Sequence, residues 1–312
     1  MKILVLGSNG LVGSSLHRVL SAVNEFDEVI PATRSQADLL NLEETSKLLD
    51  DIKPNVVINA AARVGGVLAN NLYRSQFLIE NIRINVNLLE SLIPHPEIKL
   101  INLGSSCIYP LNAENPISEE SIMTGKLEPT NSAYAMAKLT SIELGDSLSK
   151  QYGHNIINLM PTNLYGPKDN FSDKGSHVIP GLMQRIHKAK LENKDFVEVW
   201  GSGNPKREFL YVDDLASSVL FIIKNNISHN LLNIGSSEEI SISELVTLLA
   251  NLIEYKGQIK FNSNYPDGNQ KKMIDSSKIN KLGWKAETSL KEGLSKTYSW
   301  YVKNFKLLDV PK

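Results

Sequence analysis

The first thirteen residues, MKILVLGSNGLVG (Met1–Gly13), place a short apolar run directly before a glycine-rich turn. The run Lys2–Leu6 is typical of a buried strand, and the residues from Leu11 to Val23 follow with helical spacing. Glycine lets the backbone turn tightly and approach a pyrophosphate, while the helix N-terminus offers free amides and the positive end of its dipole. The spacing G-x-x-G-x-x-G alone also fits an ordinary strand-to-helix turn, but its place in a βαβ unit predicts a dinucleotide site. The turn residues are Gly7, Gly10 and Gly13.

Strand and helix patterns alternate through the first half of the chain. The predicted strands are Lys2–Leu6, Glu28–Pro31, Val56–Asn59, Lys99–Leu103 and Asn155–Met160, and the predicted helices between them are Leu11–Val23, Glu43–Ile52, Ser75–Leu92 and Ala133–Tyr152. Such alternation implies right-handed crossovers and a doubly wound parallel sheet, the Rossmann arrangement. Parallel strands are covered on both faces, which explains why these runs are apolar throughout.

The pattern changes after Pro161. The stretch Thr162–Pro180 is rich in Gly, Pro, Asn, Asp and Ser and is predicted to be a long functional loop. Further helices are expected over Val178–Lys190, from Asp213, over Ser243–Ile253 and over Leu290–Asn304, with short strands near Val197 and Phe209. We therefore predict a nucleotide-binding domain over 1–165 with a returning segment at about 209–235, and a smaller α/β substrate domain over 166–208 and 236–312.

Composition narrows the class of protein. The 312 residues are 42% hydrophobic, which suits a globular chain, and the net charge of −1 gives no reason to expect nucleic acid or an anionic membrane as a partner. A single cysteine excludes an intrachain disulfide and fits a reducing compartment. The N-terminal apolar run is too short for a signal peptide, and no stretch approaches the ~18 apolar residues of a membrane span. We expect a cytoplasmic protein and assign no residue to a metal site.

The end of the second strand bears on the choice of cofactor. It has the sequence IPATR (Ile30–Arg34). An NAD site usually places an acid here, whereas an arginine can accept the 2′-phosphate of NADP, although Arg34 could also be an ordinary surface residue. Asp38 and Leu39 follow where an adenine contact is expected. The third strand ends in Asn59–Ala62, whose small side chains would let a cofactor lie close.

Tyr134 and Lys138 lie four residues apart on one face of a predicted helix. An ammonium favours the phenolate form of a nearby tyrosine, whose pKa is ordinarily about 10, and such a tyrosine can act as a general acid towards a ketone. About one Y-x-x-x-K match is expected by chance in this composition. The position of this one is more informative, because Ser105 at the carboxyl end of the fourth strand could hydrogen-bond the same carbonyl oxygen.

These residues resemble the extended short-chain dehydrogenases, and longer blocks resemble the GDP-L-fucose synthase family, the GDP-4-keto-6-deoxy-D-mannose epimerase-reductases. The resemblance covers nearly the whole chain. The blocks are AAARVGGVLANN (Ala60–Asn71), LGSSCIYP (Leu103–Pro110), LEPTNSAYAMAK (Leu127–Lys138), MPTNLYGPKDNF (Met160–Phe171), SHVIP (Ser176–Pro180) and WGSGNPKREFLYVDD (Trp200–Asp214).

The resemblance implies NADPH as cofactor, with hydride delivered to C4 of a keto-sugar. Tyr134 would protonate the new alkoxide, Ser105 would orient the carbonyl, and Lys138 would bind the nicotinamide ribose. The full set of expected cofactor contacts is Gly7, Asn9, Gly10, Leu11, Val12, Gly13, Arg34, Asp38, Leu39, Ala61, Leu103, Ser105, Tyr134, Lys138, Pro161, Asn163, Leu164 and His177.

The resemblance also implies an epimerisation. A ketone at C4 acidifies the protons on C3 and C5, and inversion there needs an acid and a base on opposite faces of the ring. Cys107 and His177 occupy the family's positions for these roles; without the family match they would be read as a small buried residue and a solvated loop residue. A thiolate can act as a base, and histidine exchanges protons near neutral pH.

Contacts to the nucleotide-sugar follow in the same way. The positions that match the family are Ser106, Cys107, Asn163, Arg185, Trp200, Arg207 and Asp267. Arginine pairs with a diphosphate as a planar fork, and tryptophan offers a flat apolar face, although Arg185 could be a surface charge and Trp200 a core residue. The family commonly forms homodimers through the tyrosine-bearing helix and the helix before it. The apolar residues of Ser75–Leu92 could serve such a contact or cover the sheet.

Several alternatives stay open. Some family members carry an arginine where Asn9 stands, so discrimination for NADP over NAD depends more on Arg34 here. A reductase of a related GDP-keto-heptose or GDP-keto-deoxyhexose could retain Cys107 and His177 without epimerising. A 4,6-dehydratase is disfavoured because Ser106 and Cys107 stand where those enzymes typically carry an Asp-Glu pair. A non-catalytic, NADP-sensing protein on the same fold commonly loses the tyrosine or lysine, and both are present.

Overall fold

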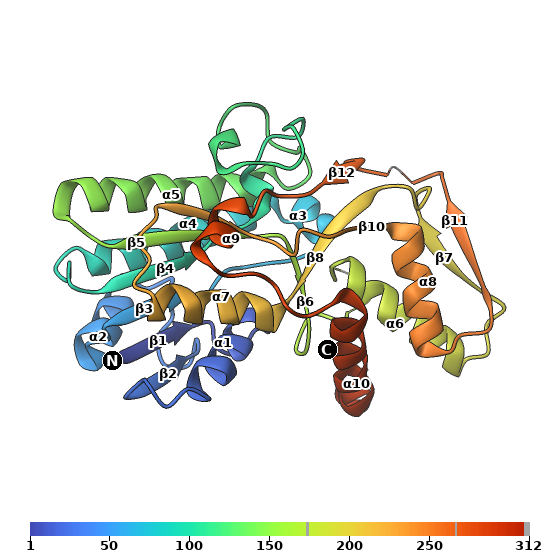
Figure 1. Cartoon of the computed structure of the whole chain (residues 1–312), viewed down its shortest axis with the longest axis horizontal. Helices are drawn as coiled ribbons and strands as arrows, with labels where there is room; N and C mark the ends of the chain where they lie inside the picture. The colour runs from blue at the N-terminus through green and yellow to red at the C-terminus, as the bar shows by residue number, and fades with distance from the viewer. Residues whose placement is uncertain (173–174, 266, 309–312) are drawn as a thin grey trace.

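A computed structural model describes residues 1–172, 175–265 and 267–308 of the chain, with side chains described as far as residue 305. Its largest element is a parallel sheet in the N-terminal half, and a smaller lobe of short strands and helices lies beside it (Figure 1). No helix in the described ranges is long and apolar enough to cross a membrane.

The main sheet has six parallel strands in the order β2-β1-β3-β4-β5-β9. The strands are β1 (Lys2–Leu6), β2 (Glu28–Ala32), β3 (Val56–Asn59), β4 (Lys99–Leu103), β5 (Ile156–Pro161) and β9 (Leu231–Ile234). The predicted doubly wound parallel sheet is confirmed. The chain leaves β5, builds much of the second lobe, and returns to add β9 at the edge of the sheet.

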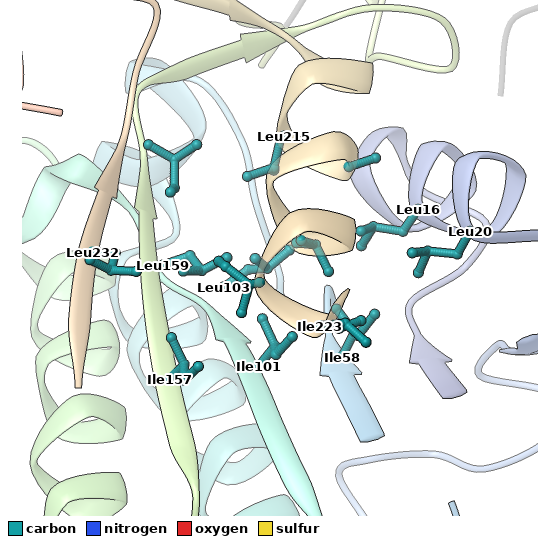
Figure 2. Close-up of a cluster of buried hydrophobic side chains, with 14 of the residues drawn as sticks. Leu16, Leu20, Ile58, Ile101, Leu103, Ile157, Leu159, Leu215, Ile223 and Leu232 are labelled. Atoms are coloured by element: carbon teal, nitrogen blue, oxygen red, sulfur yellow. The ribbon is translucent and has the colours of Figure 1, made fainter. Parts of the chain in front are cut away.

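Helices cover both faces of this sheet, as apolar strands require. On one face lie α1 (Leu11–Ser21), α7 (Val212–Lys224) and α9 (Ser277–Leu282), and on the other lie α2 (Leu42–Ile52), α4 (Arg74–Leu92) and α5 (Ser132–Tyr152). Alternate residues of β1 serve the two cores: Ile3 and Val5 join the first, Leu4 and Leu6 the second. Figure 2 shows the first core, with α1 and α7 side chains packed over the strands.

The order of the strands reverses at β1. The chain first moves outward from β1 to β2 and then returns to add β3 on the other side. In open parallel sheets a ligand binds in the crevice outside the carboxyl ends of the strands at such a reversal. The residues at this point are Gly7 after β1 and Ala60 after β3.

The second lobe has its own apolar core of aromatic and aliphatic side chains, which include Tyr165, Phe209 and Leu249. Its strands are β6 (Asn163–Tyr165), β7 (Phe196–Trp200), β8 (Lys206–Tyr211), β10 (Glu239–Ser241), β11 (Gln258–Asn262) and β12 (Lys271–Lys272). Its helices are α6 (Val178–Leu191), α8 (Ile242–Ile253) and α10 (Leu290–Leu308). Strand β8 pairs with β10, β12 and β6, while β7 pairs with β11.

One local prediction needs correction, and three short elements were not predicted. The stretch Thr162–Pro180 is not one loop: it begins with β6, which pairs with β8 far along the chain, and it ends inside α6; residues 173–174 lie outside the described residues. The sequence pattern also gave no sign of α3 (Val67–Leu72), a helix of six residues, or of the two 3-10 turns η1 (Ser106–Ile108) and η2 (Glu119–Ser121). Pairing between distant segments and such short helices have no periodic signal of their own.

Candidate active site

The glycine turn is packed as its sequence predicts. Gly7 has a φ of +72°, and a Cβ added there would lie 2.9 Å from the carbonyl carbon of Ala60. A Cβ added at Gly13 would lie 2.6 Å from the carbonyl carbon of Gly7 and 2.7 Å from the Cα of Ser8. The Gly10 amide donates to the Gly7 carbonyl at 3.1 Å. Glycine at positions 7 and 13 is therefore required by the fold of the turn itself.

Gly10 differs from its two neighbours. Its φ is −77°, and a Cβ added there would meet only the Gly7 oxygen, at 3.6 Å. The residue immediately precedes α1, and no side chain caps this helix end. Leu11 and Val12 begin the helix, and their amides belong to its first turn. Open space beside a helix N-terminus is what a pyrophosphate needs, so the turn fits a dinucleotide.

Arg34 extends from the loop after β2. Its guanidinium pairs with Asp38 at 3.0 Å, and its side chain is 72% exposed, so this ion pair is worth only about 0–1 kcal/mol and can open for a phosphate. Asp38 also accepts a hydrogen bond from the Leu40 amide, and Leu39 is buried against the sheet. Asn9 lines a cleft between α1 and the end of β2.

A row of asparagines holds the strand ends in register. Asn59 donates to Asn102 and Asn102 donates to Asn158, both at 3.0 Å, across three neighbouring strands. All three side chains are buried. Asn59 also accepts from the Ala61 amide at 3.1 Å, which fixes the backbone just beyond β3. Of the three, only Asn59 was named as a site residue from the sequence, because one asparagine in a strand predicts no contact until the pairing of the strands is known.

Lys138 lies buried in α5 and donates to the carbonyl oxygen of Leu103 at 2.7 Å. Burial lowers the pKa of Lys138 to about 8. Its Nζ atom is 5.8 Å from the centre of the Tyr134 ring, so the two residues share a face as the spacing predicts. The hydrogen bond ties the helix to the end of β4.

The acid–base state of Tyr134 differs from the expected one. Burial, with the Cys107 thiol as a second cause, raises the pKa of Tyr134 well above its ordinary value. The Y-x-x-x-K spacing predicts that Lys138 lowers this pKa, but the Lys138 ammonium is directed to the Leu103 carbonyl. Tyr134 is thus a neutral phenol that can donate a proton. Phe77 packs edge-on against its ring, with centroids 6.3 Å apart.

Ser105 and Cys107 follow β4 in one short turn. The hydroxyl of Ser105 accepts from the Cys107 amide at 3.2 Å and caps η1. The thiol is partly exposed and accepts from the side-chain amide of Asn131 at 3.6 Å. Asn131 precedes α5, so it joins the cysteine to the helix that carries Tyr134. Sequence reasoning missed Asn131, although it stands three residues before the tyrosine. Ser106, which is expected to contact substrate, is buried in the same turn.

His177 immediately precedes α6, and its imidazole is 48% exposed. The segment before it reaches the first lobe, because the Gly66 amide donates to the Gly175 carbonyl at 2.8 Å. Gly65 beside it faces the Phe77 ring, which in turn contacts Tyr134. The structure thus brings the segment before this histidine against the loop between β3 and α3.

The four residues predicted from the second lobe gather near the ends of β7 and β8. Arg207 donates to the carbonyls of Lys206 and Asn269, and Arg185 donates to the Glu198 carbonyl at 3.3 Å. Burial lowers the pKa of both guanidinium groups, which favours an anionic partner for each. Asp267 accepts from the amide and hydroxyl of Ser202, and these hydrogen bonds lower its pKa.

Trp200 is not a core residue. It is 55% exposed and stacks on Tyr265, with ring centroids 4.5 Å apart and an interplanar angle of 15°. Tyr265 was not predicted, since an isolated tyrosine in a loop has no sequence pattern of its own.

Three more of the expected contact residues lie where β5 ends and β6 begins. Asn163 donates to the Glu208 carbonyl at 2.8 Å, while Leu164 is partly buried and Pro161 is buried. No group of His, Cys, Asp or Glu in the described ranges is placed to share a metal ion.

Comparisons with known proteins agree with this arrangement. Residues 3–235 match the model of the NAD dependent epimerase/dehydratase family. The chain is 45% identical over 303 residues to the putative GDP-L-fucose synthase 2 of Arabidopsis thaliana, covering 97% of this chain and 92% of that protein. It is 44% identical to the GDP-L-fucose synthase of Sinorhizobium fredii, covering 97% and 96%.

Solved structures of similar fold include NADP-bound enzymes that act on GDP-sugars. The GDP-mannoheptose C4 reductase of Campylobacter jejuni, solved with NADP bound, has a TM-score of 0.86 and 33% identity, covering 96% of this chain and 98% of that one. The GDP-L-fucose synthetase of Naegleria fowleri, bound to NADP, has a TM-score of 0.89 and 28% identity, covering 98% and 93%. The chain belongs to the NAD dependent epimerase/dehydratase family and, within it, to the GDP-L-fucose synthases.

Proposed function

We propose that this chain is an NADPH-dependent enzyme that epimerises C3 and C5 of GDP-4-keto-6-deoxy-D-mannose and reduces C4, giving GDP-L-fucose. The observation that carries the proposal is the group that follows β4, where Ser105 and Cys107 lie beside Tyr134 of α5. A proton donor and a thiol at one carbonyl site suit both halves of the reaction. The names of the relatives supply the substrate.

NADPH supplies the hydride when it is bound. The open space at Gly10 and the first amides of α1 would hold its pyrophosphate. Arg34 would hold the 2′-phosphate after releasing Asp38, and Lys138 would hold the nicotinamide ribose. Gly7, Asn9, Leu39, Ala61 and the other residues expected from sequence complete the proposed contacts.

Tyr134 carries the reductive half. As a neutral phenol it donates its proton to the oxygen at C4 while that oxygen gains negative charge. Ser105 hydrogen-bonds the same oxygen and orients the ketone. Lys138 acts through its position, because its bond to the Leu103 carbonyl keeps α5 against the end of β4.

Cys107 and His177 carry the epimerising half. One removes the proton next to the ketone, and the other returns a proton to the opposite face of the ring. Their origin in different lobes supports the proposal, since groups that act on opposite faces must approach from opposite sides. Asn131 donates to the thiol and would stabilise it as an anion.

We propose that the two lobes divide the ligands. Residues 1–165 with 209–235 would hold the cofactor, and 166–208 with 236–312 would hold the nucleotide-sugar; residues 173–174, 266 and 309–312 lie outside the described part. Arg185 and Arg207 would face the diphosphate, because both are cations whose surroundings partly desolvate the guanidinium group and lower its pKa. Trp200 and Asp267 complete the proposed nucleotide contacts.

A second candidate is reduction at C4 without epimerisation, on a GDP-keto-heptose. The likeness to the C4 reductase from Campylobacter jejuni favours it. The two candidates are separated by offering GDP-4-keto-6-deoxymannose and a GDP-keto-heptose in parallel with NADPH and identifying each product sugar. GDP-L-fucose with a clear preference in kcat/KM for the deoxyhexose supports the main proposal. A product still in the D-manno series would contradict its epimerase half.

We also infer a homodimer and a cytoplasmic location. Helices α4 and α5 pack side by side, and each leaves an apolar side chain exposed, Ile79 at 49% and Met136 at 48%. Light scattering on a gel-filtration column tests the dimer, and Met136→Glu should dissociate it. The lone thiol of Cys107 supports a reducing compartment, which cell fractionation tests.

A further inference from the structure

Asp169 is a buried carboxylate that the reaction as described leaves unused. Only 8% of the residue is exposed. Its Oδ1 atom accepts a hydrogen bond from the Asn170 amide at 2.7 Å. Its Oδ2 atom is buried and has no hydrogen-bond partner among the described residues. A buried acceptor normally has a partner, so an unused one needs an explanation.

A strained turn immediately before Asp169 sets the direction of this carboxylate. The Asp169 amide donates to the Gly166 carbonyl at 3.3 Å, with Pro167 second in the turn and Lys168 third. Lys168 has a φ of +65°, in the left-handed region that a lysine rarely adopts. Proline followed by a residue of positive φ fits a type II turn, where glycine is the usual third residue. Such strain persists only where the surroundings impose it, and it clusters at functional sites.

Neighbouring contacts hold the turn in place. Phe171, two residues after Asp169, is buried against two aromatic side chains of α10. The centroid of its ring lies 6.0 Å from that of Trp300 and 4.7 Å from that of Tyr301. The carboxylate is therefore fixed by the second lobe's core and does not move freely with a surface loop.

His177 lies beside this carboxylate, on the side of its Oδ1 atom. Its Nδ1 atom is 4.0 Å from Oδ1 of Asp169. The imidazole makes no capping bond to α6 and is half exposed, so these contacts leave the ring free to turn towards the carboxylate. Catalytic hydrogen bonds are often long without substrate and shorten when it binds.

We propose that Asp169 is the positioning residue for His177: its carboxylate accepts the Nδ1 hydrogen and leaves Nε2 to face the sugar ring. The inference rests on the proposed function of His177. When the imidazolium acts as acid, the Nε2–H bond breaks, a C–H bond forms at the enolate carbon, and the electron pair stays on nitrogen. When it acts as base the same steps run in reverse. In both directions Nδ1 keeps its hydrogen and its bond to Asp169.

Three variants separate positioning from folding. Asp169→Asn keeps an acceptor for the Asn170 amide but removes the charge. Asp169→Glu restores the carboxylate. Asp275→Asn is a matched control, because Asp275 also accepts a backbone amide in a turn, that of Ser277 at 2.8 Å, outside the site. Unfolding temperature and NADPH affinity should be unchanged in all three.

The first readout is the tautomer of His177, observed by nitrogen NMR at about pH 8.5, where a histidine is ordinarily neutral. His177→Gln assigns its signal among the six histidines. We expect the Nδ1–H form in the wild type and in Asp275→Asn, and a shift towards Nε2–H in Asp169→Asn. A wild-type imidazole with its hydrogen on Nε2 would overturn the proposal, even if Asp169→Asn failed to fold.

The second readout is deuterium uptake from heavy water at the carbons beside the ketone of GDP-4-keto-6-deoxymannose, without NADPH. We expect at least a tenfold loss of rate in Asp169→Asn and partial recovery in Asp169→Glu. Uptake at the wild-type rate in Asp169→Asn overturns the positioning role and leaves the proposed function standing. No uptake in the wild type would count against the proposed function, and the tautomer would still decide the role of Asp169.

Discussion

Replacing Gly10 and Gly13 in turn by alanine should separate cofactor binding from folding. The two residues belong to one turn but face different surroundings. A methyl group at Gly13 would lie 2.6 Å from the Gly7 carbonyl carbon and 2.7 Å from the Ser8 Cα, so backbone atoms must shift. A methyl group at Gly10 would meet one atom, at the ordinary contact distance of 3.6 Å, and its φ of −77° suits alanine.

The magnitudes follow from these contacts. Overpacking of this kind costs about 1–3 kcal/mol, so Gly13→Ala should lower the unfolding temperature by roughly 2–5 °C. Gly10→Ala should leave that temperature within about 1 °C, because the added methyl group displaces nothing in the protein. It should nevertheless raise the Kd for NADPH at least tenfold, about 1.4 kcal/mol, because the methyl group occupies the space that the pyrophosphate would enter.

The assay pairs differential scanning calorimetry with a fluorescence titration of NADPH on the same preparations. We expect opposite patterns: Gly13→Ala loses stability, and Gly10→Ala loses NADPH affinity while it keeps its stability. Gly10→Ala protein that binds NADPH as tightly as the wild type would refute the placement of the pyrophosphate at this helix end. Gly13→Ala protein of unchanged stability would refute the packing argument.

Three further predictions concern single side chains. Arg34→Ala should raise the Kd for NADPH about tenfold and leave that for NADH unchanged in the same titration, since charge-assisted hydrogen bonds contribute about 1.5–3 kcal/mol; equal losses for both would show that Arg34 does not read the 2′-phosphate. Lys138 has a pKa of about 8 in the folded protein and an ordinary pKa of 10.5. Between pH 8 and 10.5 the unfolded chain therefore binds more protons than the folded one, and the free energy of unfolding should rise with pH across that window. Urea unfolding at both ends of the window should show the rise in the wild type and its loss in Lys138→Met; an identical slope in the variant would contradict the assignment. Cys107→Ser should bind NADPH normally yet lose solvent exchange at C3 or C5 by about a hundredfold, measured by mass spectrometry, and unchanged exchange would show that Cys107 is not the base.

The parts that the sequence predicts well have a strong local pattern. Strands β1, β3 and β4 lie where their apolar runs place them, and α5 begins one residue before its predicted start. The turn after β1 follows from glycine spacing, and the packing of Gly13 supplies the physical reason. Apolar runs and glycines report on burial and backbone shape, which are set within a few residues.

The parts that the sequence could not predict depend on contacts between distant segments. The pairing of β6 with β8 and the position of Asn131 beside the Cys107 thiol are examples. The pKa of Tyr134 is another, because its burial and the direction of the Lys138 ammonium are properties of the folded site. Cys107 and His177 were identified by resemblance alone, since neither a single cysteine nor a loop histidine has a pattern of its own.

We propose that one site exchanges protons beside the ketone and then reduces that ketone. The most direct test is one reaction with GDP-4-keto-6-deoxymannose and unlabelled NADPH in heavy water, followed by proton NMR of the product sugar. We expect GDP-L-fucose with deuterium at C3 and C5 and with protium at C4, because the first two hydrogens come from solvent and the third comes from the cofactor. A reduced sugar that retains protium at C3 and C5 would contradict the proposal.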